Sequence, residues 1–358
     1  MVVKDGRYYC ANGTGRFASE LASLGNDVTM FGQQVIDPSS TSSYDILDGG
    51  VNVAGLKRYK SKLLSYLLLY SFSIKYILES DFVYLFYPTS YCYIPFICRF
   101  LRKKYGLYVR GTNGIDNGLS KALYRGAYVV FTVASHFTDI VNEVSKKSNG
   151  HTVRPMISYT DKDVVIDRQY HSKDKYSILL LSRIEKDKGI DELLEAFKNL
   201  INKGINNIHL TIVGGGGYLE NARYKVKLFN ISRYVTIEGN VDDEEKKKSY
   251  YRNADIYILP TYHEGFPRTL YEAMIYGTPI ITTFVGGIHS LMVDGNNCVK
   301  IIERSSKSIE EKLQFAIDNY EMMGKYAINA TQTIQKVVDP KRLSHAEDLD
   351  RVVRQINK

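Results

Sequence analysis

Two glutamates stand eight residues apart in the segment LPTYHEGFPRTLYEAMIYG, residues 259–277. Glu264 follows an apolar run that ends at Leu259, and Glu272 falls in the helical pattern that comes next. Between them, Gly265–Leu270 present backbone N–H groups at a helix start, where a phosphate or diphosphate is favoured. A carboxylate on each side could accept hydrogen bonds from the hydroxyls of a sugar and of a ribose. The alternative is a loop carboxylate followed by an ordinary helix-surface residue.

Two cations follow another short apolar run, SILLLS (Ser177–Ser182). Arg183 and Lys188 are five residues apart on one predicted loop and can converge on a diphosphate, the first as a forked donor and the second as a point charge. Glu185 and Asp187 are interleaved with them. A solvated turn is therefore the alternative interpretation.

Glycine-rich segments also stand beside predicted elements. In ANGTGRFASEL (Ala11–Leu21), Gly13 and Gly15 open a helical pattern and would let a ligand approach the backbone. A lone GxG is a weak signal, and a plain turn is the alternative. The segments VGGGG (213–217) and FVGG (284–287) carry the same ambiguity.

Strand and helix patterns alternate along the chain. In the second half the predicted strands are SILLLS, IHLTIV, YVTIEGNV, DIYIL and TPIITT, with helices over 190–201, from about 218, and over RTLYEAMIYG. In the first half they are VTMFGQ, FVYLFYP, GLYVRGT and AYVVFTV, with helices over GRFASELASLG, KSKLLSYLLLYSFSIKYIL and YIPFICRFLRKKYG. A polar segment over 153–177 separates the halves, and residues 340–358 form a final helical pattern. The pattern predicts two doubly wound α/β domains whose ligands bind beyond the carboxyl ends of parallel strands.

Composition excludes several classes of protein. The 358 residues are 44% hydrophobic and 24% charged, which is normal for globular domains. The four cysteines form no CxxC pair and stand near no histidine cluster, so we expect no metal site and a cytoplasmic protein. HExxH, P-loop and GxSxG patterns are absent. The longest apolar stretch, Leu63–Leu78, is interrupted by polar residues and is shorter than the ~20 residues of a membrane-spanning helix.

Nearly all of the net charge of +8 falls within residues 1–158. A basic half is typical of contact with nucleic acid, anionic lipid or acidic ligands, or it serves only solubility. No nucleic-acid-binding motif is present, so we expect no nucleic-acid partner. The segment KRYKSKLLSYLLLYSFSIKYIL (57–78) mixes basic with apolar residues as an interfacial helix does, which predicts contact with an anionic membrane. The alternative is that these apolar side chains are core.

The spacing of Glu264 and Glu272 resembles the E-x7-E signature of the retaining glycosyltransferases of family GT4, which have the GT-B fold. The second half carries the likeness strongly, in LLSRIEKDKGIDELLEAF, LTIVGGGG, VTIEGNV and ADIYILPTYHEGFPRTLYEAMIYGTPIITTFVGGI. The first half carries it loosely, in KDGRYYCANGTGRFASELASLGNDVTMFGQ and LYVRGT. The resemblance implies an acceptor domain over 1–158, a nucleotide-sugar donor domain over 159–338, and a final helix over 339–358 that packs back on the first domain.

The resemblance also implies roles in sugar transfer from a UDP- or GDP-linked donor, with retention of configuration and without a metal or other cofactor. Glu264 would contact the transferred sugar, while Arg183 and Lys188 would neutralise the diphosphate. Glu272 would hold the ribose hydroxyls. The other implied donor contacts are Gly13, Gly15, Gly265, Phe266, Pro267, Thr269, Leu270, Gly239, Asn240, Val241 and Arg110. The acceptor would be a glycan or lipid-linked glycan of bacterial surface polysaccharide synthesis, at the inner face of the cell membrane.

Four departures from the family pattern keep other functions open. Only Met-Val-Val precedes Lys4 where members begin with an apolar strand, so we expect that strand to be short or missing. Arg110 stands where many members have a histidine, Ser290 where an acidic residue is common, and Cys298 where a glycine is common. A non-catalytic or inactive sugar-nucleotide-binding protein is therefore the main alternative. A GT-B-fold epimerase or phosphorylase lacks a supporting motif, and a nicotinamide-dependent oxidoreductase lacks the full GxGxxG pattern.

Overall fold

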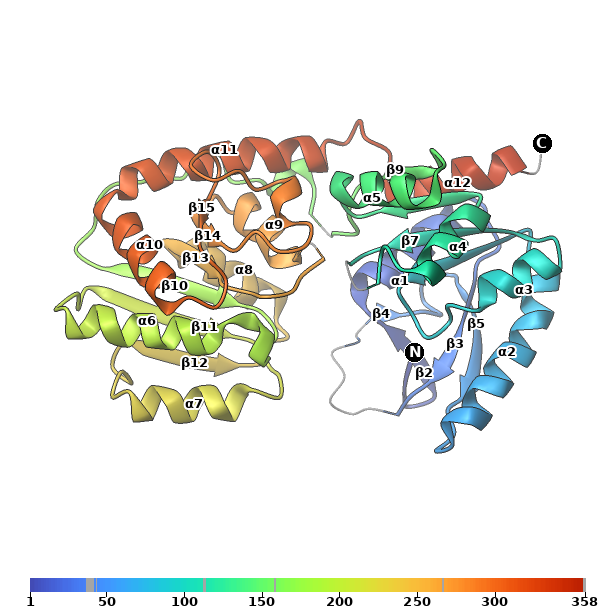
Figure 1. Ribbon diagram of the computed structural model, residues 1–358, viewed down its shortest axis with the longest axis horizontal. Helices are drawn as coiled ribbons and strands as arrows, with labels where there is room; N and C mark the ends of the chain where they lie inside the picture. Colours follow the sequence, from blue (N-terminus) through green and yellow to red (C-terminus); the bar gives the residue numbers. More distant parts are fainter. Residues whose placement is uncertain (37–41, 43, 112–113, 158, 266, 357–358) are drawn as a thin grey trace. The chain divides into compact units, whose positions relative to one another are not determined.

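The computed structural model of the protein describes residues 1–36, 42, 44–111, 114–157, 159–265 and 267–356. The chain divides into two compact units (Figure 1). Unit 1 comprises Met1–Ser158 together with Pro340–Lys358, and unit 2 comprises Tyr159–Asp339. The predicted domain boundaries lie at or next to this division. Unit 1 thus includes the final helix, as the resemblance implies.

Unit 2 is built on one six-stranded parallel sheet with the strand order β12-β11-β10-β13-β14-β15. Its strands are β10 (Tyr176–Leu181), β11 (Ile208–Val213), β12 (Val235–Gly239), β13 (Ile256–Leu259), β14 (Ile280–Thr282) and β15 (Val299–Lys300). The predicted strands of this half are all present. The order is that of a doubly wound sheet, in which the strand order reverses between the first and fourth strands, here β10 and β13, while all strands remain parallel. Ligands bind beyond the carboxyl ends of the strands at that switch point.

Helices cover the sheet of unit 2. They are α6 (Ile190–Asn202), α7 (Leu219–Leu228), α8 (Glu244–Asn253), α9 (Arg268–Ile275), α10 (Ser306–Asp318) and α11 (Tyr320–Val338), with the short 3-10 helices η1 (Asp161–Asp163), η2 (Lys186–Lys188) and η3 (Ile288–Ser290). Helix α6 packs against α7 and α10, whereas α11 packs against α9. The predicted apolar face of α6 is buried, which confirms its helical spacing.

In the described residues of unit 1 the strands are distributed over three sheets. A parallel sheet joins β6 (Phe82–Tyr87), β7 (Lys104–Val109), β8 (Val129–Thr132) and β9 (Gly150–Thr152), and a parallel pair joins β3 (Thr29–Gln34) to β5 (Asn52–Lys57). The third sheet joins β1 (Val2–Lys4), β2 (Arg7–Cys10) and β4 (Tyr44–Asp45) in antiparallel pairs. The helices of this unit are α1 (Asn12–Ser23), α2 (Lys62–Glu79), α3 (Ile94–Phe100), α4 (Gly118–Gly126), α5 (Ser135–Ser145) and α12 (His345–Ile356).

The short first strand forms a hairpin. Val2–Lys4 pair antiparallel with Arg7–Cys10, and the turn between them is Asp5–Gly6 with φ angles of 48° and 75°. An Asp-Gly pair is a strong hairpin signal because both central residues of a type I′ turn need positive φ. The sequence contained this signal, but the hairpin was not predicted from it. Val2 forms an isolated parallel bridge with Val35, directly after β3, and the Met1 ammonium donates to Gln33 O within β3 at 2.9 Å.

One predicted helix of unit 1 was too long. The pattern over Tyr93–Gly106 predicted a single helix, but α3 ends at Phe100 and β7 begins at Lys104. The end is a Schellman motif: Arg102 takes a φ of 57°, and Lys103 N donates to Cys98 O at 2.7 Å. Arginine rarely occupies this left-handed position, so composition did not signal the stop. Helices α4 and α5 were not predicted.

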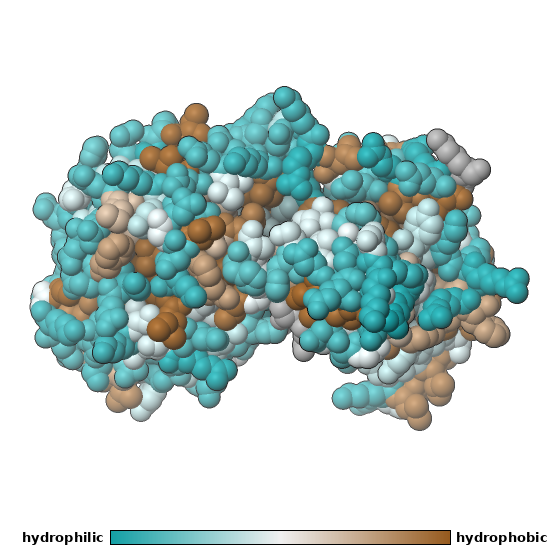
Figure 2. Space-filling model, turned by 45° about the horizontal axis from the view of Figure 1, so that its top comes forward, coloured by the Kyte–Doolittle hydropathy of each residue, from teal (hydrophilic) through white to brown (hydrophobic). Residues whose placement is uncertain are grey.

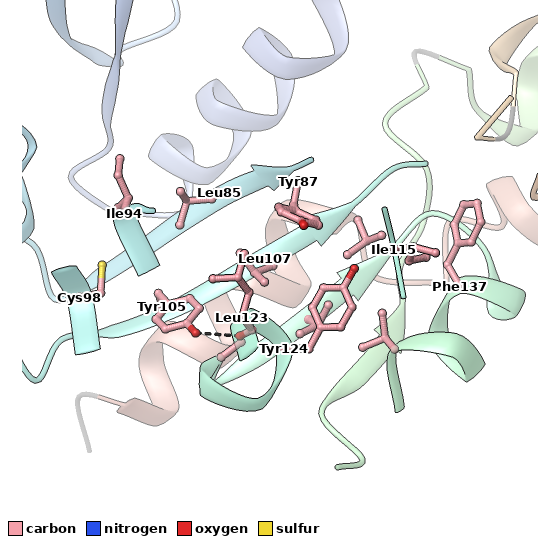
Figure 3. Packing of buried hydrophobic residues seen from close by; sticks show 14 of the residues in the cluster. Leu85, Tyr87, Ile94, Cys98, Tyr105, Leu107, Ile115, Leu123, Tyr124 and Phe137 are labelled. Carbon is pink, nitrogen blue, oxygen red and sulfur yellow. Dashed lines mark hydrogen bonds between the residues drawn. The ribbon is translucent and has the colours of Figure 1, made fainter. Parts of the chain in front are cut away.

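One core cluster of unit 1 lies between its four-stranded sheet and α3, α4 and α5 (Figure 3). Leu85 and Leu107 from neighbouring strands pack with Cys98, Leu123 and Phe137 from the covering helices. Inside this cluster the Tyr105 hydroxyl donates to the backbone oxygen of Leu123 at 2.7 Å. That bond satisfies a buried polar group that would otherwise destabilise the fold.

Helix α2 has two different faces. Ser65, Leu69, Ser73 and Ile77 are buried at a spacing of four residues, so the core interpretation holds for this face. The other face exposes large apolar side chains: Leu63, Leu64, Tyr66, Leu67, Phe72, Ile74 and Leu78. Hydrophobic side chains gather over α2 at the lower right of the space-filling view (Figure 2). No helix in the described parts of the chain is long and apolar enough to span a bilayer.

Helix α12 is anchored to unit 1 by a histidine inside an aromatic enclosure. The His345 ring lies 4.7 Å from that of Phe17 and 4.4 Å from that of Tyr108, and its Nε2 is 2.6 Å from the Tyr84 hydroxyl. Burial lowers the pKa of His345 to about 3. The native protein therefore keeps this ring neutral, whereas the unfolded chain protonates it near pH 6.5.

We expect acid to weaken this anchor. A folded pKa below the unfolded one gives stability that is present above pH 6.5 and is lost as the pH falls towards 3. Wild-type protein should lose about 2 kcal/mol more than His345→Gln between pH 7 and pH 5, because glutamine does not titrate. Chemical unfolding of both proteins, followed by circular dichroism at the two pH values, measures this difference. Parallel losses in the two proteins would contradict the assignment to His345.

Candidate active site

A lysine and a glutamate that could act in catalysis meet at the point of unit 2 where the strand order reverses. Lys188 ends η2, which follows β10, and Glu264 lies in the loop after β13. Lys188 is almost fully buried, and its Nζ lies 2.5 Å from Glu264 Oε1. The sequence predicted that both residues follow strand ends, and the structure joins them in an ion pair. Because a buried ammonium is costly without a partner, this pair fixes the position of the glutamate.

Thr261 completes this network. Its side chain is buried, and Oγ1 lies 3.5 Å from both Lys188 Nζ and Glu264 Oε1. The same hydroxyl donates at 3.3 Å to Asp187 O, on the other loop. Lys188 also donates to the backbone oxygen of His263 at 3.4 Å. The two loops are therefore cross-linked through polar side chains inside unit 2.

Glycines let the surrounding loops approach the pair closely. Gly286 has a φ of 60°, and a Cβ on it would overlap the backbone oxygen of Glu264. Beside it, Gly287 N donates to Gly265 O at 2.6 Å. Gly189 has a φ of 67° and approaches Pro260 O in the same way. The FVGG segment therefore has a structural role, since it supports the backbone that carries Glu264.

The four-glycine loop after β11 packs on the loop after β10. A Cβ on Gly214 or Gly216 would overlap a backbone oxygen of the other loop, and Ile184 N donates to Gly215 O at 2.8 Å. Gly214 N donates at 2.8 Å to Gly239 O, at the end of β12. These glycines thus bring the ends of three neighbouring strands together.

Glu272 lies on α9, half-buried beside tyrosines. The rings of Tyr251 and Tyr276 stack at 5.8 Å, and that of Tyr159 meets Tyr276 edge-on at 6.1 Å. Burial raises the pKa of Tyr251, and the negative charge of Glu272 raises it further. The surroundings of this carboxylate are therefore largely aromatic.

This surrounding changes the ionisation of Glu272. Burial raises its pKa to about 7. The Tyr251 hydroxyl lowers the pKa in part, Glu244 raises it, and Lys247 and Arg268 lower it. Because ribose hydroxyls can donate to a carboxylate, a bound diol would stabilise the ionised form and lower this pKa.

We expect Glu272→Gln to stabilise the ligand-free protein in a pH-dependent way. A folded pKa above the unfolded one gives stability that is present below pH 4.5 and is lost as the pH rises through about 7. The substitution should therefore raise the unfolding free energy of unit 2 by about 2–3 kcal/mol at pH 8 and by little at pH 5. Chemical unfolding at both pH values tests this. The exposed Glu195→Gln, on α6 and away from Glu272, is the control, and the same pH-dependent gain in both variants would contradict the assignment.

The N-terminal end of α9 lies next to Glu264. Pro267 is the N-cap, and Leu270 N donates to Pro267 O at 3.1 Å. The Thr269 hydroxyl is buried and has no hydrogen-bond partner among the described residues. Predicted contact Phe266 lies outside the described residues. A helix N-terminus with an unsatisfied hydroxyl beside it can accept an anion.

Four other predicted site residues lie on the loop after β10 and at the end of β12. Arg183 is exposed on the loop that carries Lys188. Gly239 ends β12 with a φ of 83°, followed by Asn240, whose amide donates to Asp242 at 2.9 Å, and Val241. These residues border the glycine loop, because a Cβ on Gly215 would lie 3.3 Å from that of Asn240.

Three predicted residues belong to unit 1. Gly13 and Gly15 lie within the first turns of α1 rather than in a turn before it, since the helix begins at Asn12. A Cβ on Gly15 would overlap the Tyr44 ring, so close packing requires glycine there. Arg110 directly follows β7, and its guanidinium lies 4.9 Å from the Phe86 ring centroid.

Sequence reasoning missed Thr261, Gly286 and the tyrosines beside Glu272. Thr261 stood in the opening motif, but its spacing does not show that it bridges two loops. Gly286 was in a motif that remained ambiguous, and its contact with Glu264 requires the fold. Among the described residues no group of three or more His, Cys, Asp or Glu side chains could hold a metal ion. The expectation that no cofactor is needed remains a prediction.

Comparison with known proteins gives a family match that lies within unit 2. Residues 161–333 match the family model for glycosyl transferases group 1. A capsular polysaccharide biosynthesis glycosyltransferase, CapM of Staphylococcus aureus, is 28% identical over 175 residues, 48% of this chain and 44% of the relative. A 2-deoxystreptamine N-acetyl-D-glucosaminyltransferase of Niallia circulans is 30% identical over 125 residues, 35% of this chain and 32% of the relative. The chain thus spans less than half the length of these relatives.

Solved structures resemble the whole chain. A glycosyltransferase from Rickettsia africae superposes with a TM-score of 0.71 at 14% identity, covering 97% of this chain and 94% of the other. Anabaena HepE in complex with UDP superposes with a TM-score of 0.70 at 13% identity, covering 98% and 97%. At such low identity the likeness shows the fold. The predicted GT-B fold, with two Rossmann-like units, is therefore confirmed.

Proposed function

We propose that this protein is a retaining glycosyltransferase of family GT4. It transfers a sugar from a nucleoside-diphosphate sugar to a glycan or lipid-linked acceptor of surface polysaccharide synthesis. The observation that carries the proposal is the buried Lys188–Glu264 pair at the switch point, next to the helix that bears Glu272. The group 1 match over 161–333 covers these residues. CapM, named for capsular polysaccharide biosynthesis, supports the acceptor class.

The donor would bind along the carboxyl ends of β10 and β13. Glu272 accepts hydrogen bonds from the ribose, and Glu264 from the transferred sugar. Arg183 reaches the diphosphate from the exposed side of its loop, and Lys188 adds positive charge from the interior of unit 2. As the bond from the sugar to the diphosphate breaks, negative charge grows on the leaving group. Fixed cations and helix amides stabilise that charge, so no protein nucleophile is required.

Solved relatives support a nucleotide-sugar donor and favour uridine over guanosine. HepE has been crystallised with UDP, with UDP and glucose, and with UDP-glucose. Its fold covers nearly the whole of this chain. We therefore place UDP-sugars first among candidate donors. We propose that no metal ion or other cofactor takes part in the transfer.

The exposed face of α2 supports a second part of the proposal: the protein contacts the anionic inner face of the cell membrane. Leu63 is 73% exposed and Leu67 58%. Lys57, Arg58 and Lys60 are exposed directly before the helix. Apolar side chains beside cations suit an interface of acyl chains and anionic headgroups.

Flotation with vesicles tests the membrane contact. Wild-type protein should float with phosphatidylglycerol-containing vesicles and much less with pure phosphatidylcholine. Leu63→Ser combined with Leu67→Ser should abolish flotation while leaving nucleotide binding unchanged. Equal flotation of the double variant, or none for wild-type protein, would remove this part of the proposal and leave the transfer reaction to its own test.

Nucleotide binding and transfer test the main proposal. A thermal-shift screen of wild-type protein and Glu272→Ala against UDP, GDP, ADP, CMP and NAD(H) comes first. A ligand at 100 times its Kd stabilises by about 2.7 kcal/mol, which is a readable shift. We expect one nucleoside diphosphate to stabilise wild-type protein and not the variant, and its sugar to be transferred to a glycan acceptor. Failure of all nucleoside diphosphates would refute the proposal, and a shift with NAD(H) alone would favour an oxidoreductase.

The divided strands of unit 1 favour a second candidate, a sugar-nucleotide-binding protein without transfer activity. In the described residues β3–β5 and β6–β9 form separate sheets, and β1 pairs in a hairpin. Such a protein would bind the nucleotide but neither transfer nor hydrolyse its sugar. Release of nucleoside diphosphate from the donor therefore separates the two candidates.

A further inference from the structure

A segment without regular strands lies against the end of the helix that carries Glu272. This linker segment, residues 159–170, follows Ser158 of unit 1 in the chain and forms the first part of unit 2. The carbonyls of residues 275–277, at the end of α9, each accept a hydrogen bond from it. The donors are Val165 N at 2.8 Å, the Arg168 guanidinium at 3.2 Å and the Tyr170 hydroxyl at 2.7 Å. The carbonyls that a helix leaves unpaired at its C-terminal end are thereby satisfied.

Arg168 bonds a second helix end with the same guanidinium. It donates at 3.2 Å to Tyr251 O, in the last turn of α8, and to the hydroxyl of Thr278. It also donates to the backbone oxygen of Ala254, the C-cap of α8. One cation therefore serves the C-terminal ends of two helices, where the helix dipoles favour positive charge.

Helix α9 has only eight residues, so its position depends on contacts at its ends. Its N-terminal end lies beside Glu264, and Glu272 is in its second turn. A shift at the C-terminal end would move Glu272 relative to the loops that hold Glu264. The hydrogen bonds from Arg168 oppose that shift. Its planar guanidinium donates to four acceptors on two helices and one loop, and therefore ties the three segments together.

We propose that Arg168 is a positioning residue of the donor site, holding the C-terminal end of α9 and through it the Glu272 carboxylate where a nucleotide ribose binds. The inference rests on the proposed function for the role of Glu272. A guanidinium suits this task because its five donors have a fixed planar geometry, whereas an ammonium offers three on a flexible stem. Lysine should therefore restore the charge and only part of the positioning.

The test compares Arg168→Met, Arg168→Lys and the matched control Lys173→Met. Lys173 lies just beyond the linker segment and pairs with Asp255 of unit 2 at 2.5 Å, without contact to α9 in the described structure. The first readout is amide hydrogen exchange of residues 270–276 relative to the strands of unit 2. The second is the affinity for UDP and for its 2′,3′-dideoxy analogue, since only UDP offers the diol to Glu272.

We expect Arg168→Met to speed exchange in α9 selectively and to weaken UDP binding by about tenfold to a hundredfold, as loss of hydrogen bonds from a charged group implies. The dideoxy analogue should lose little, and Arg168→Lys should fall between wild-type protein and Arg168→Met. If Arg168→Met matches Lys173→Met in both readouts, or loses protection evenly across unit 2, the inference is overturned. If wild-type protein does not bind UDP, the uridine donor of the proposed function fails, and the exchange measurement still decides whether Arg168 positions α9.

Discussion

Lys188→Met is expected to lower kcat/KM for the sugar donor by about a hundredfold to a thousandfold, the cost of losing one fixed group that stabilises transition-state charge. Two effects combine. The cation nearest the carboxylate of Glu264 disappears, and Glu264 loses the 2.5 Å ion pair that holds it in place. Steady-state kinetics with the donor found in the nucleotide screen measure the loss.

Stability must be separated from catalysis in this experiment. Removing one partner of a buried ion pair costs about 3–5 kcal/mol, and somewhat less here because Glu264 keeps some exposure. The double variant Lys188→Met/Glu264→Gln leaves unpaired only the partly exposed Asp187, which lies 3.6 Å from Lys188 Nζ in the wild-type protein. It should recover most of the stability without recovering activity. Lys173→Met, which breaks another lysine–carboxylate pair of unit 2, should change kcat/KM by less than about threefold. Equal losses of activity in Lys173→Met and Lys188→Met would show that Lys188 acts only through folding.

Strands β10 to β14 and helices α6, α7 and α9 of unit 2 were predictable because local pattern and tertiary environment agree there, whereas α8, α10, α11 and β15 were not predicted. Runs such as SILLLS are short, apolar and buried on both faces of a parallel sheet, and α6 shows the helical spacing that it buries. Unit 1 was less predictable. The stop of α3 depends on Arg102 in a left-handed conformation, and the hairpin of β1 was hidden by the expectation of an incomplete parallel strand.

The candidate site was predictable as a set of loops but not as a set of contacts. Strand ends identified the loops of Lys188 and Glu264, because parallel strands bring their carboxyl ends to one edge. That the two side chains form an ion pair depends on β10 and β13 being neighbours, which the order along the chain does not show. Arg168 lay in a segment without periodicity, and its acceptors are more than 80 residues away in sequence. Such contacts leave no local signal.

Gly286→Ala tests whether the backbone beneath Glu264 is as closely packed as the structure implies. A Cβ at this position overlaps Glu264 O, and the φ of 60° is itself unfavourable for alanine by about 1 kcal/mol. The overlap involves backbone on both sides, so neither can move by changing a rotamer. The loop that carries Glu264 must therefore shift. Because a displacement of about 1 Å at a reacting centre can cost about a hundredfold in rate, we expect a loss of that size in sugar transfer.

Gly295→Ala is the matched control for this effect. Gly295 has a φ of 68°, but a Cβ there would meet no heavy atom within 4 Å. The two substitutions therefore impose the same backbone strain, of about 1 kcal/mol, and differ in whether they push on Glu264. Gly295→Ala should reduce thermal stability slightly and leave kcat/KM within about twofold of wild-type protein, since surface substitutions far from a site act independently of it. If both variants lose activity equally, left-handed strain alone explains the loss, and the contact between Gly286 and Glu264 does not control the geometry of the site.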